Sequence, residues 1–331
     1  MRGGALLGSR ATVRPMSATP AGPAPGERVP LGRTGLTVSR LGLGLAPIGG
    51  MFAPVPPEAA TATVERAWEL GIRLYDTAPV YGYGRSETCA GAALADKPRD
   101  AFVLCTKVGR LIEPGGPDIQ PLWADPPPGV GPRLDHSYAA THRSVAESLD
   151  RLGLDRVDVL HIHDPDLDYP TALGGAYRAL DELRRDGVIG AVSLGVNHPA
   201  VAARFVREAP APGPDCVLVA GGCTLLDRSA ADDLLPLCAD RGIAVMAAGV
   251  ITPALAAAER AAVRAVCDRH GVPPLAAALQ LPLCLPAVAT VLVGARTPEE
   301  ITESATQLTH PIPKAFWPEL AAAVEGGGAG R

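Results

Sequence analysis

From residue 41 to residue 309 the chain alternates short apolar runs with segments of helical periodicity, and this repeat most constrains its fold. We interpret the apolar runs as buried strands: 41–48, 73–76, 102–106, 157–162, 191–196, 216–220, 243–248 and 288–293. The helical segments are 57–70, 86–95, 138–152, 170–186, 199–208, 229–241, 257–270, 274–285 and 298–309. Eight strands alternating with helices predict a single-domain α/β fold, a closed (β/α)8 TIM barrel with its helices outside.

An open, doubly wound sheet is the alternative arrangement of such a repeat. That fold binds its dinucleotide at a glycine-rich turn after the first strand. Here the segment 42–47, with the sequence GLGLAP, lacks the required glycine spacing, and Pro47 removes a backbone N–H that such a turn would use. The closed barrel is therefore favoured.

The expected domain boundaries follow from composition. Residues 1–29 are rich in Gly, Ala, Pro and Arg and lack the apolar stretch of a secretory signal. They predict a disordered leader, or a start assigned too early, with Met16 as the true one. The barrel is expected over residues 30–321, and 322–331 as a flexible tail. Prolines interrupt the apolar segment 273–295, which indicates a buried helix and strand and not a membrane span.

Four polar residues stand where predicted strands end, or just beyond. Asp76 closes the second strand and Tyr81 follows five residues later, while Lys107 and His163 follow the third and fourth strands. The carboxyl ends of the strands meet at one mouth of such a barrel, which is where the active sites of barrel enzymes lie. A phenol there can donate a proton to a carbonyl oxygen. A nearby ammonium, held by a carboxylate, would lower its pKa from about 10. The imidazole of His163 would orient the substrate oxygen.

A second interpretation concerns the pattern His161-x-His163. Side chains two residues apart on a strand face the same way, so this pair could begin a metal site in a barrel hydrolase. Further ligands are needed, and only His198 among the other histidines lies just after a strand. We therefore expect no metal and interpret His161 as a core residue below His163. Alone, an Asp76–Lys107 pair could equally be structural.

Composition excludes other classes of function. The net charge of -5 comes without a block of five like charges, so we expect neither a nucleic-acid nor a membrane-surface partner. The seven cysteines are scattered, mostly within apolar runs, and form no C-x-x-C motif. This usage is typical of free thiols in the reducing cytoplasm, where we place the protein.

Two further segments have the chemistry of a dinucleotide site. Asn197 ends the fifth strand, and its amide can both donate to and accept from a nicotinamide carboxamide, although it could instead stabilise the following turn. The segment Gly294-Ala295-Arg296 leads into a helix N-terminus, which suits a phosphate. The long segment 111–137, which includes Trp123, has no helical period, and we expect it to wall a substrate pocket.

These motifs resemble the aldo-keto reductase superfamily. The resemblance rests on 74–87 (LYDTAPVYGYGRSE), 106–110 (TKVGR) and 158–166 (DVLHIHDPD), and it extends over most of the barrel. Within the superfamily the chain is most similar to the D-threo-aldose 1-dehydrogenase branch. That resemblance implies NAD or NADP as cofactor and a sugar or small carbonyl compound as substrate, with oxidation of an aldose C1 to a lactone favoured. It implies catalytic roles for Asp76, Tyr81, Lys107 and His163, and cofactor contacts at Asn197 and from Gly294 to Ser304.

The chain departs from that branch on the cofactor side. Gly222-Cys223 stands where relatives carry Arg-Tyr, so Cys223 is expected beside the nicotinamide in place of an aromatic ring. The segment 252–254 replaces a longer loop, and Ser304 replaces an Asn near the adenine. Glu300 would repel a 2′-phosphate and favours NAD, whereas Arg296 favours NADP. The departures keep open a second hypothesis, a cofactor-binding but slow sensor or partner subunit.

Overall fold

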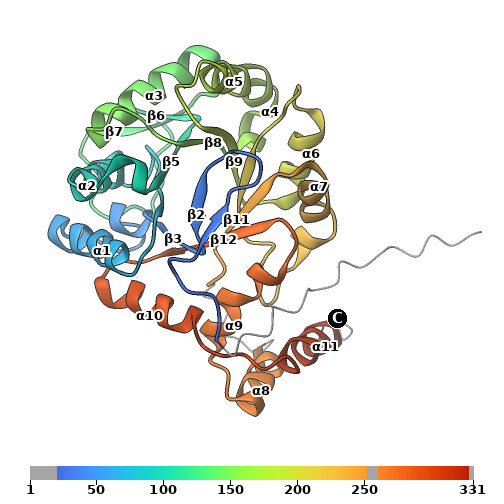
Figure 1. Cartoon of the computed structure of the whole chain (residues 1–331). Helices are drawn as coiled ribbons and strands as arrows, with labels where there is room; N and C mark the ends of the chain where they lie inside the picture. Colours follow the sequence, from blue (N-terminus) through green and yellow to red (C-terminus); the bar gives the residue numbers. More distant parts are fainter. Residues whose placement is uncertain (1–20, 252–259, 328–331) are drawn as a thin grey trace, which may run out of the picture.

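A closed barrel of eight parallel strands forms the centre of the molecule (Figure 1). The computed structural model describes residues 21–251 and 260–327. The strands pair around the barrel in the order β10-β11-β12-β3-β4-β5-β8-β9, and β9 pairs with β10 to close the ring. The last barrel strand in the chain, β12, thus lies next to the first, β3. Their bounds are β3 Leu41–Gly44, β4 Leu74–Asp76, β5 Val103–Val108, β8 Val159–His163, β9 Ala191–Val196, β10 Cys216–Ala220, β11 Ala244–Ala248 and β12 Val288–Gly294. The predicted barrel is confirmed.

Most helices surround the barrel, whereas the two within 260–270 and 316–327 pack against each other to one side of it, as Figure 1 shows. They are α1 Pro57–Glu69, α2 Arg85–Leu94, α3 Tyr138–Leu152, α4 Tyr169–Thr171, α5 Tyr177–Arg185, α6 Pro199–Glu208, α7 Leu234–Arg241, α8 Arg260–His270, α9 Pro274–Gln280, α10 Pro298–Leu308 and α11 Phe316–Gly327. Local sequence explains the ends of α3: the Ser137 hydroxyl accepts the Ala140 N–H at 3.2 Å, and Gly153 ends the helix with a φ of 62°. Within the predicted helix 170–186, a π-helical segment, Ala172–Ala176, separates α4 from α5.

The hydrophobic core has two main compartments. One lies between the strands and the surrounding helices. The other fills the barrel interior at the amino ends of the strands, where Leu74, Val103 and Met246 pack with the hairpin of β1 (Arg28–Pro30) and β2 (Thr37–Ser39). Because this hairpin covers one end of the barrel, the mouth at the carboxyl ends of the strands is left for a site.

The segment between β5 and α3 is more ordered than its sequence predicts. A two-stranded antiparallel sheet forms from β6 (Arg110–Pro114) and β7 (Val130–Leu134), within a stretch that we expected to be irregular. Salt bridges from Arg133 to Glu113 support the pairing. The residues between the two strands reach back to the mouth of the barrel, where Trp123 forms an isolated antiparallel β-bridge with Met51.

Several predicted boundaries shift. The first strand ends at Gly44 and not at residue 48, because Pro47 starts a 3₁₀ turn. The leader was predicted to reach residue 29, yet the Gly22 N–H already donates to Thr309 O and β1 begins at Arg28. The tail was predicted from residue 322, whereas α11 continues to Gly327. The expected short loop at 252–254 lies outside the described residues. In the described ranges, no helix is long and apolar enough to cross a membrane.

A buried carboxylate ties three of these elements together. Glu87 of α2 has no exposed surface, and it accepts hydrogen bonds at 2.6 Å from Thr106 of β5 and from Arg151 of α3. We expect Glu87→Ala to lower the free energy of unfolding by about 3 kcal/mol, because it strands the guanidinium and the hydroxyl without their acceptor. Chemical denaturation measures this. Glu69→Ala, which removes an exposed i,i+3 partner of Arg66, should cost less than about 0.5 kcal/mol. Equal losses would contradict the interpretation.

Candidate active site

The four predicted catalytic side chains converge at the carboxyl mouth of the barrel. Asp76 ends β4, Lys107 lies near the end of β5 and His163 ends β8, while Tyr81 lies on the loop between β4 and α2. The Lys107 Nζ lies 5.0 Å from the centre of the Tyr81 ring, and the Tyr81 and His163 rings meet edge to face at 6.1 Å. The structure therefore brings together all four residues that the sequence singled out.

Lys107 and Asp76 form a buried ion pair. The ammonium donates to both carboxylate oxygens at 2.7 Å and to the Thr77 carbonyl at 2.9 Å, which uses its three N–H groups. Burial by itself would favour the neutral amine, but the Asp76 charge outweighs it and raises the pKa of Lys107. Burial likewise opposes ionisation of Asp76, yet Lys107 and His161 bring its pKa below the ordinary value. Both groups are charged at neutral pH.

Burial has the largest effect on the pKa of Tyr81. Removal from water raises the pKa of Tyr81 above its ordinary value, although the positive charge of Lys107 offsets part of that rise. The sequence led us to expect that the charge of Lys107 lowers this pKa. Its charge does act in that direction, but desolvation is the larger effect, so the pKa of Tyr81 rises overall. The phenol is thus protonated at neutral pH, ready to donate, and Lys107 reduces the cost of forming the phenolate.

His163 is held as a neutral imidazole. Its pKa lies well below the ordinary value, first because the ring is buried and then because Arg110 and Lys107 place positive charge nearby. The backbone carbonyl of His163 is 2.9 Å from the Nε2 atom of the buried His136. A neutral ring can donate one hydrogen bond to a substrate oxygen without adding charge to the site.

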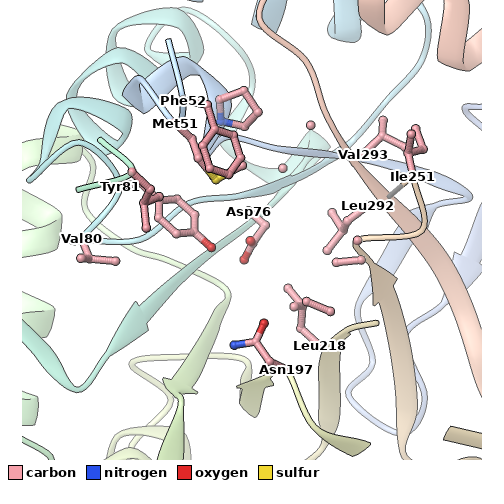
Figure 2. Close-up of a pocket in the computed structure, with 18 of the residues that line it drawn as sticks. Met51, Phe52, Asp76, Val80, Tyr81, Asn197, Leu218, Ile251, Leu292 and Val293 are labelled. Carbon is pink, nitrogen blue, oxygen red and sulfur yellow. The ribbon is translucent and has the colours of Figure 1, made fainter. Parts of the chain in front are cut away.

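A cavity of about 670 Å³ opens in front of these groups. In Figure 2 the phenol of Tyr81, the carboxylate of Asp76 and the amide of Asn197 point into one space, with Leu218 and Leu292 on its far side. The mouth loops contribute Met51, Phe52, Gln120, Leu122 and Trp123. Trp123 packs 5.5 Å from the Tyr81 ring, centre to centre. Part of the predicted 111–137 segment therefore walls the cavity, as expected.

The predicted cofactor residues divide into two groups. Asn197, Gly294, Arg296 and Glu300 line the cavity. Ala295, Cys223 and Ser304 are buried and are not among its lining residues. A Cβ on Gly294 would lie 2.7 Å from the ring of Pro47, so this close approach requires glycine. At the same end, the Nε atom of Arg296 is buried without a hydrogen-bond partner. A polar group of a long ligand would fit there.

The structure places Cys223 in the core and not beside a nicotinamide position. Its side chain has no exposed surface and packs in the cluster between strands and helices. Burial raises the pKa of Cys223 to about 12, so the thiol is also unreactive. The preceding Gly222 has a φ of 67°, and a Cβ there would lie 2.5 Å from Pro199. Glycine at 222 thus follows from a tight turn, which sets the direction of Cys223.

The metal-site interpretation finds little support in the geometry. In the described ranges, Asp76, Cys105 and His161 place potential ligand atoms within 4.8 Å of one another. The ammonium of Lys107 already contacts both oxygens of Asp76. Burial raises the pKa of Cys105 well above its ordinary value, so this residue stays a thiol and not the thiolate that binds metals. His161 is fully buried with Nε2 3.1 Å from Asp76 Oδ1, which confirms that it is a core residue below His163.

Comparison with known proteins agrees with this geometry. The Aldo/keto reductase family matches residues 40–325. The chain belongs to the aldo/keto reductase family. It is 38% identical to a D-threo-aldose 1-dehydrogenase of Pseudomonas sp., covering 87% of this chain and 95% of that protein. It is 39% identical to a pyridoxal 4-dehydrogenase of Microbacterium luteolum, covering 89% and 96%.

A solved structure supports the fold. The chain superposes on a glycerol dehydrogenase of Gluconobacter oxydans with a TM-score of 0.70, at 23% identity over 94% of this chain and 96% of that one. At this identity the likeness concerns the fold alone. Together with the family match, it confirms the predicted resemblance and barrel. The chain is an NAD(P)-dependent oxidoreductase of the aldo/keto reductase family.

Sequence reasoning missed several residues of the cavity, and two of them bear on the site most directly. Asp164 lines the cavity next to His163, and Phe52 projects at its rim with 71% of its surface exposed. Asp164 belongs to the motif 158–166 and directly follows the strand end that carries His163, which was an available signal. Phe52 lies after the glycine pair that follows the first strand, where no periodicity marks it.

Three histidines, two of them buried and one half-buried, predict how stability depends on pH. Burial lowers the pKa of His136, His161 and His163, so the unfolded chain binds more protons than the folded one below about pH 6.5. Stability is therefore retained above that pH and lost as pH falls. Urea denaturation should show stability falling between pH 7.5 and 5.5, by at most about 1.4 kcal/mol for each histidine. In His163→Gln this pH-dependent loss of stability should be smaller, and an unchanged loss in that variant would contradict the role of His163 in it.

Proposed function

We propose that this enzyme oxidises the anomeric carbon of an aldose to a lactone, and that the same site, acting in the reductive direction, can reduce a small aldehyde or ketone. The observation that carries the proposal is a phenol in the cavity wall, next to a buried ammonium–carboxylate pair and a neutral imidazole. This is an acid–base site for a hydroxyl or carbonyl oxygen. The dehydrogenase relatives, one of them named for D-threo-aldoses, support the choice of substrate.

Tyr81 would hold the transferred proton. In reduction, the Tyr81 phenol gives its proton to the carbonyl oxygen and becomes a phenolate. In oxidation, that phenolate accepts the proton of the C1 hydroxyl and becomes the phenol again. The charge of Lys107 favours the phenolate that appears between these events, since it lowers the pKa of Tyr81 against the effect of burial. Asp76 holds the ammonium in place through both carboxylate oxygens.

His163 and the cavity wall would position the substrate. The neutral His163 ring can hydrogen-bond the reacting oxygen, which fixes the direction of C1. Trp123, Met51 and Leu122 form an apolar wall beside Tyr81. Such a wall excludes water from the proton-transfer site.

The residues present fit a nicotinamide dinucleotide along the same cavity. Asn197 would hold the nicotinamide end, and Arg296 would bind the phosphate or adenosine part through its unpartnered Nε. When bound, the nicotinamide ring supplies the hydride acceptor or donor. The buried, free cysteines support placement of this activity in the reducing cytoplasm.

The preferred cofactor in this proposal is NAD. Glu300 lines the cavity, accepts the Arg296 backbone N–H at 2.7 Å and lies 3.8 Å from the Arg296 guanidinium. Its carboxylate would repel a 2′-phosphate, and it already partly balances the charge of Arg296.

Tyr81→Phe tests the chemistry. The variant should lose about 100-fold or more in kcat for aldose oxidation, because the proton acceptor is gone, while its affinity for NADH stays within about twofold. Absorbance of reduced nicotinamide across an aldose and aldehyde panel measures the first effect, and fluorescence titration measures the second. Tyr138→Phe, on the exposed start of α3, is the matched control and should keep full activity. Robust turnover in Tyr81→Phe would refute the mechanism.

Cofactor choice is tested by fluorescence titration with NADH and NADPH. We expect NADH to bind about tenfold more tightly than NADPH. Glu300→Gln should reduce this difference in affinity, because it removes the repulsion of the NADPH 2′-phosphate. Glu299→Gln, at the neighbouring position outside the cavity lining, should leave the ratio unchanged. Tighter binding of NADPH to the unmodified protein would reverse the assignment.

A further inference from the structure

One carboxylate in the cavity wall stands outside the catalytic four. Asp164 follows His163 directly; its Oδ1 atom accepts a hydrogen bond from the Asn197 amide at 2.9 Å, and its Oδ2 atom lies 2.9 Å from Arg110 Nη1. We propose that Asp164 is a positioning residue for the nicotinamide: it orients the amide of Asn197 and balances the charge of Arg110 beside the cavity. This inference rests on the proposed function, since it assumes that Asn197 receives the cofactor.

The backbone directs Asp164 toward Asn197. Its φ of 44° and ψ of 60° fall in the left-handed region, which aspartate tolerates better than most residues. The Asp164 N–H still donates to Gly195 O at 2.9 Å, so the turn begins while β8 is paired with β9. Asn197 follows the end of that neighbouring strand, and the two side chains therefore meet across adjacent strand ends.

The carboxylate decides which way the amide faces. A carboxylate only accepts hydrogen bonds, so the nitrogen of the Asn197 amide must turn to Asp164 and the oxygen must turn elsewhere. Figure 2 shows that oxygen directed into the space where Asp76 and Tyr81 also point. Asn197 is exposed and would otherwise rotate freely. An acceptor fixed before the ligand arrives avoids the entropy cost of ordering it on binding.

The same carboxylate sets the charge of this wall. Arg110 is 8% exposed, and it contributes to lowering the pKa of His163. Without Asp164, its positive charge would lie uncompensated beside the cavity. The oxidised nicotinamide ring is cationic and the reduced ring is neutral. Loss of the Asp164 charge should therefore weaken the oxidised cofactor more than the reduced one, a difference that a merely structural role would not produce.

The first test measures binding without turnover. In Asp164→Asn, we expect the Kd for NAD⁺ to rise about tenfold and that for NADH to rise less, by about threefold. NADH is followed by its fluorescence and NAD⁺ by calorimetry on the full chain. Asp166→Asn is the control, since Asp166 is exposed and outside the cavity lining, and both Kd values should stay within about twofold. Equal weakening of the two cofactors, or no change in either, would overturn the proposal.

A double-mutant cycle then tests whether Asp164 acts through Asn197. Asp164→Ala and Asn197→Ala should each weaken NADH binding, but in the Asn197→Ala background Asp164→Ala should add less than about twofold. If the fold-changes in Kd of the two single variants instead multiply in the double variant, the positioning role is overturned. Thermal unfolding of each variant separates loss of fold from loss of binding. Because these measurements concern binding and Tyr81→Phe concerns turnover, failure of this inference can be told apart from failure of the proposed function.

Discussion

The buried pair of Lys107 and Asp76 is the interaction on which the site depends. An ammonium inside a barrel is stable only when its charge and its hydrogen-bond donors are all met. Both oxygens of Asp76 and the Thr77 carbonyl meet them here, and all three come from the end of β4. The pair therefore fastens β5 to β4 at the mouth. It also supplies the positive charge against which the pKa of Tyr81 is set.

A second set of buried polar contacts holds the loop that carries Tyr81. The Ser86 hydroxyl lies 2.8 Å from that of Thr77 and donates to the Leu45 carbonyl at 2.9 Å. Glu87, the next residue, is bonded to Thr106 and Arg151. The loop is thus anchored at both ends to the barrel wall. A phenol on a loop can then keep a fixed position, which proton transfer requires.

The cavity divides between chemistry and recognition. Rigid strand ends supply Asp76 and His163, whereas loops supply Met51, Phe52 and Trp123 at the rim. This division is usual for barrels, in which loops vary and strand ends keep the reaction. The departures on the cofactor side also acquire a physical meaning: Gly222 is required by a tight turn, and Cys223 fills the core instead of facing a ligand.

The sequence by itself determined the barrel and predicted which polar residues meet at its mouth, the ones that we propose as catalytic. Strand and helix periods are local, and a polar residue that ends an apolar run must lie at a strand end, so Asp76, Lys107 and His163 could be assigned without coordinates. Only the tertiary structure decided the direction in which the pKa of Tyr81 shifts from its ordinary value. Burial sets that direction, and it depends on residues such as Trp123 that come from distant loops. The tertiary structure likewise decided the direction of Cys223 and the link from Asp164 to Asn197. Such contacts join separate strand ends, and no local pattern in the chain encodes them.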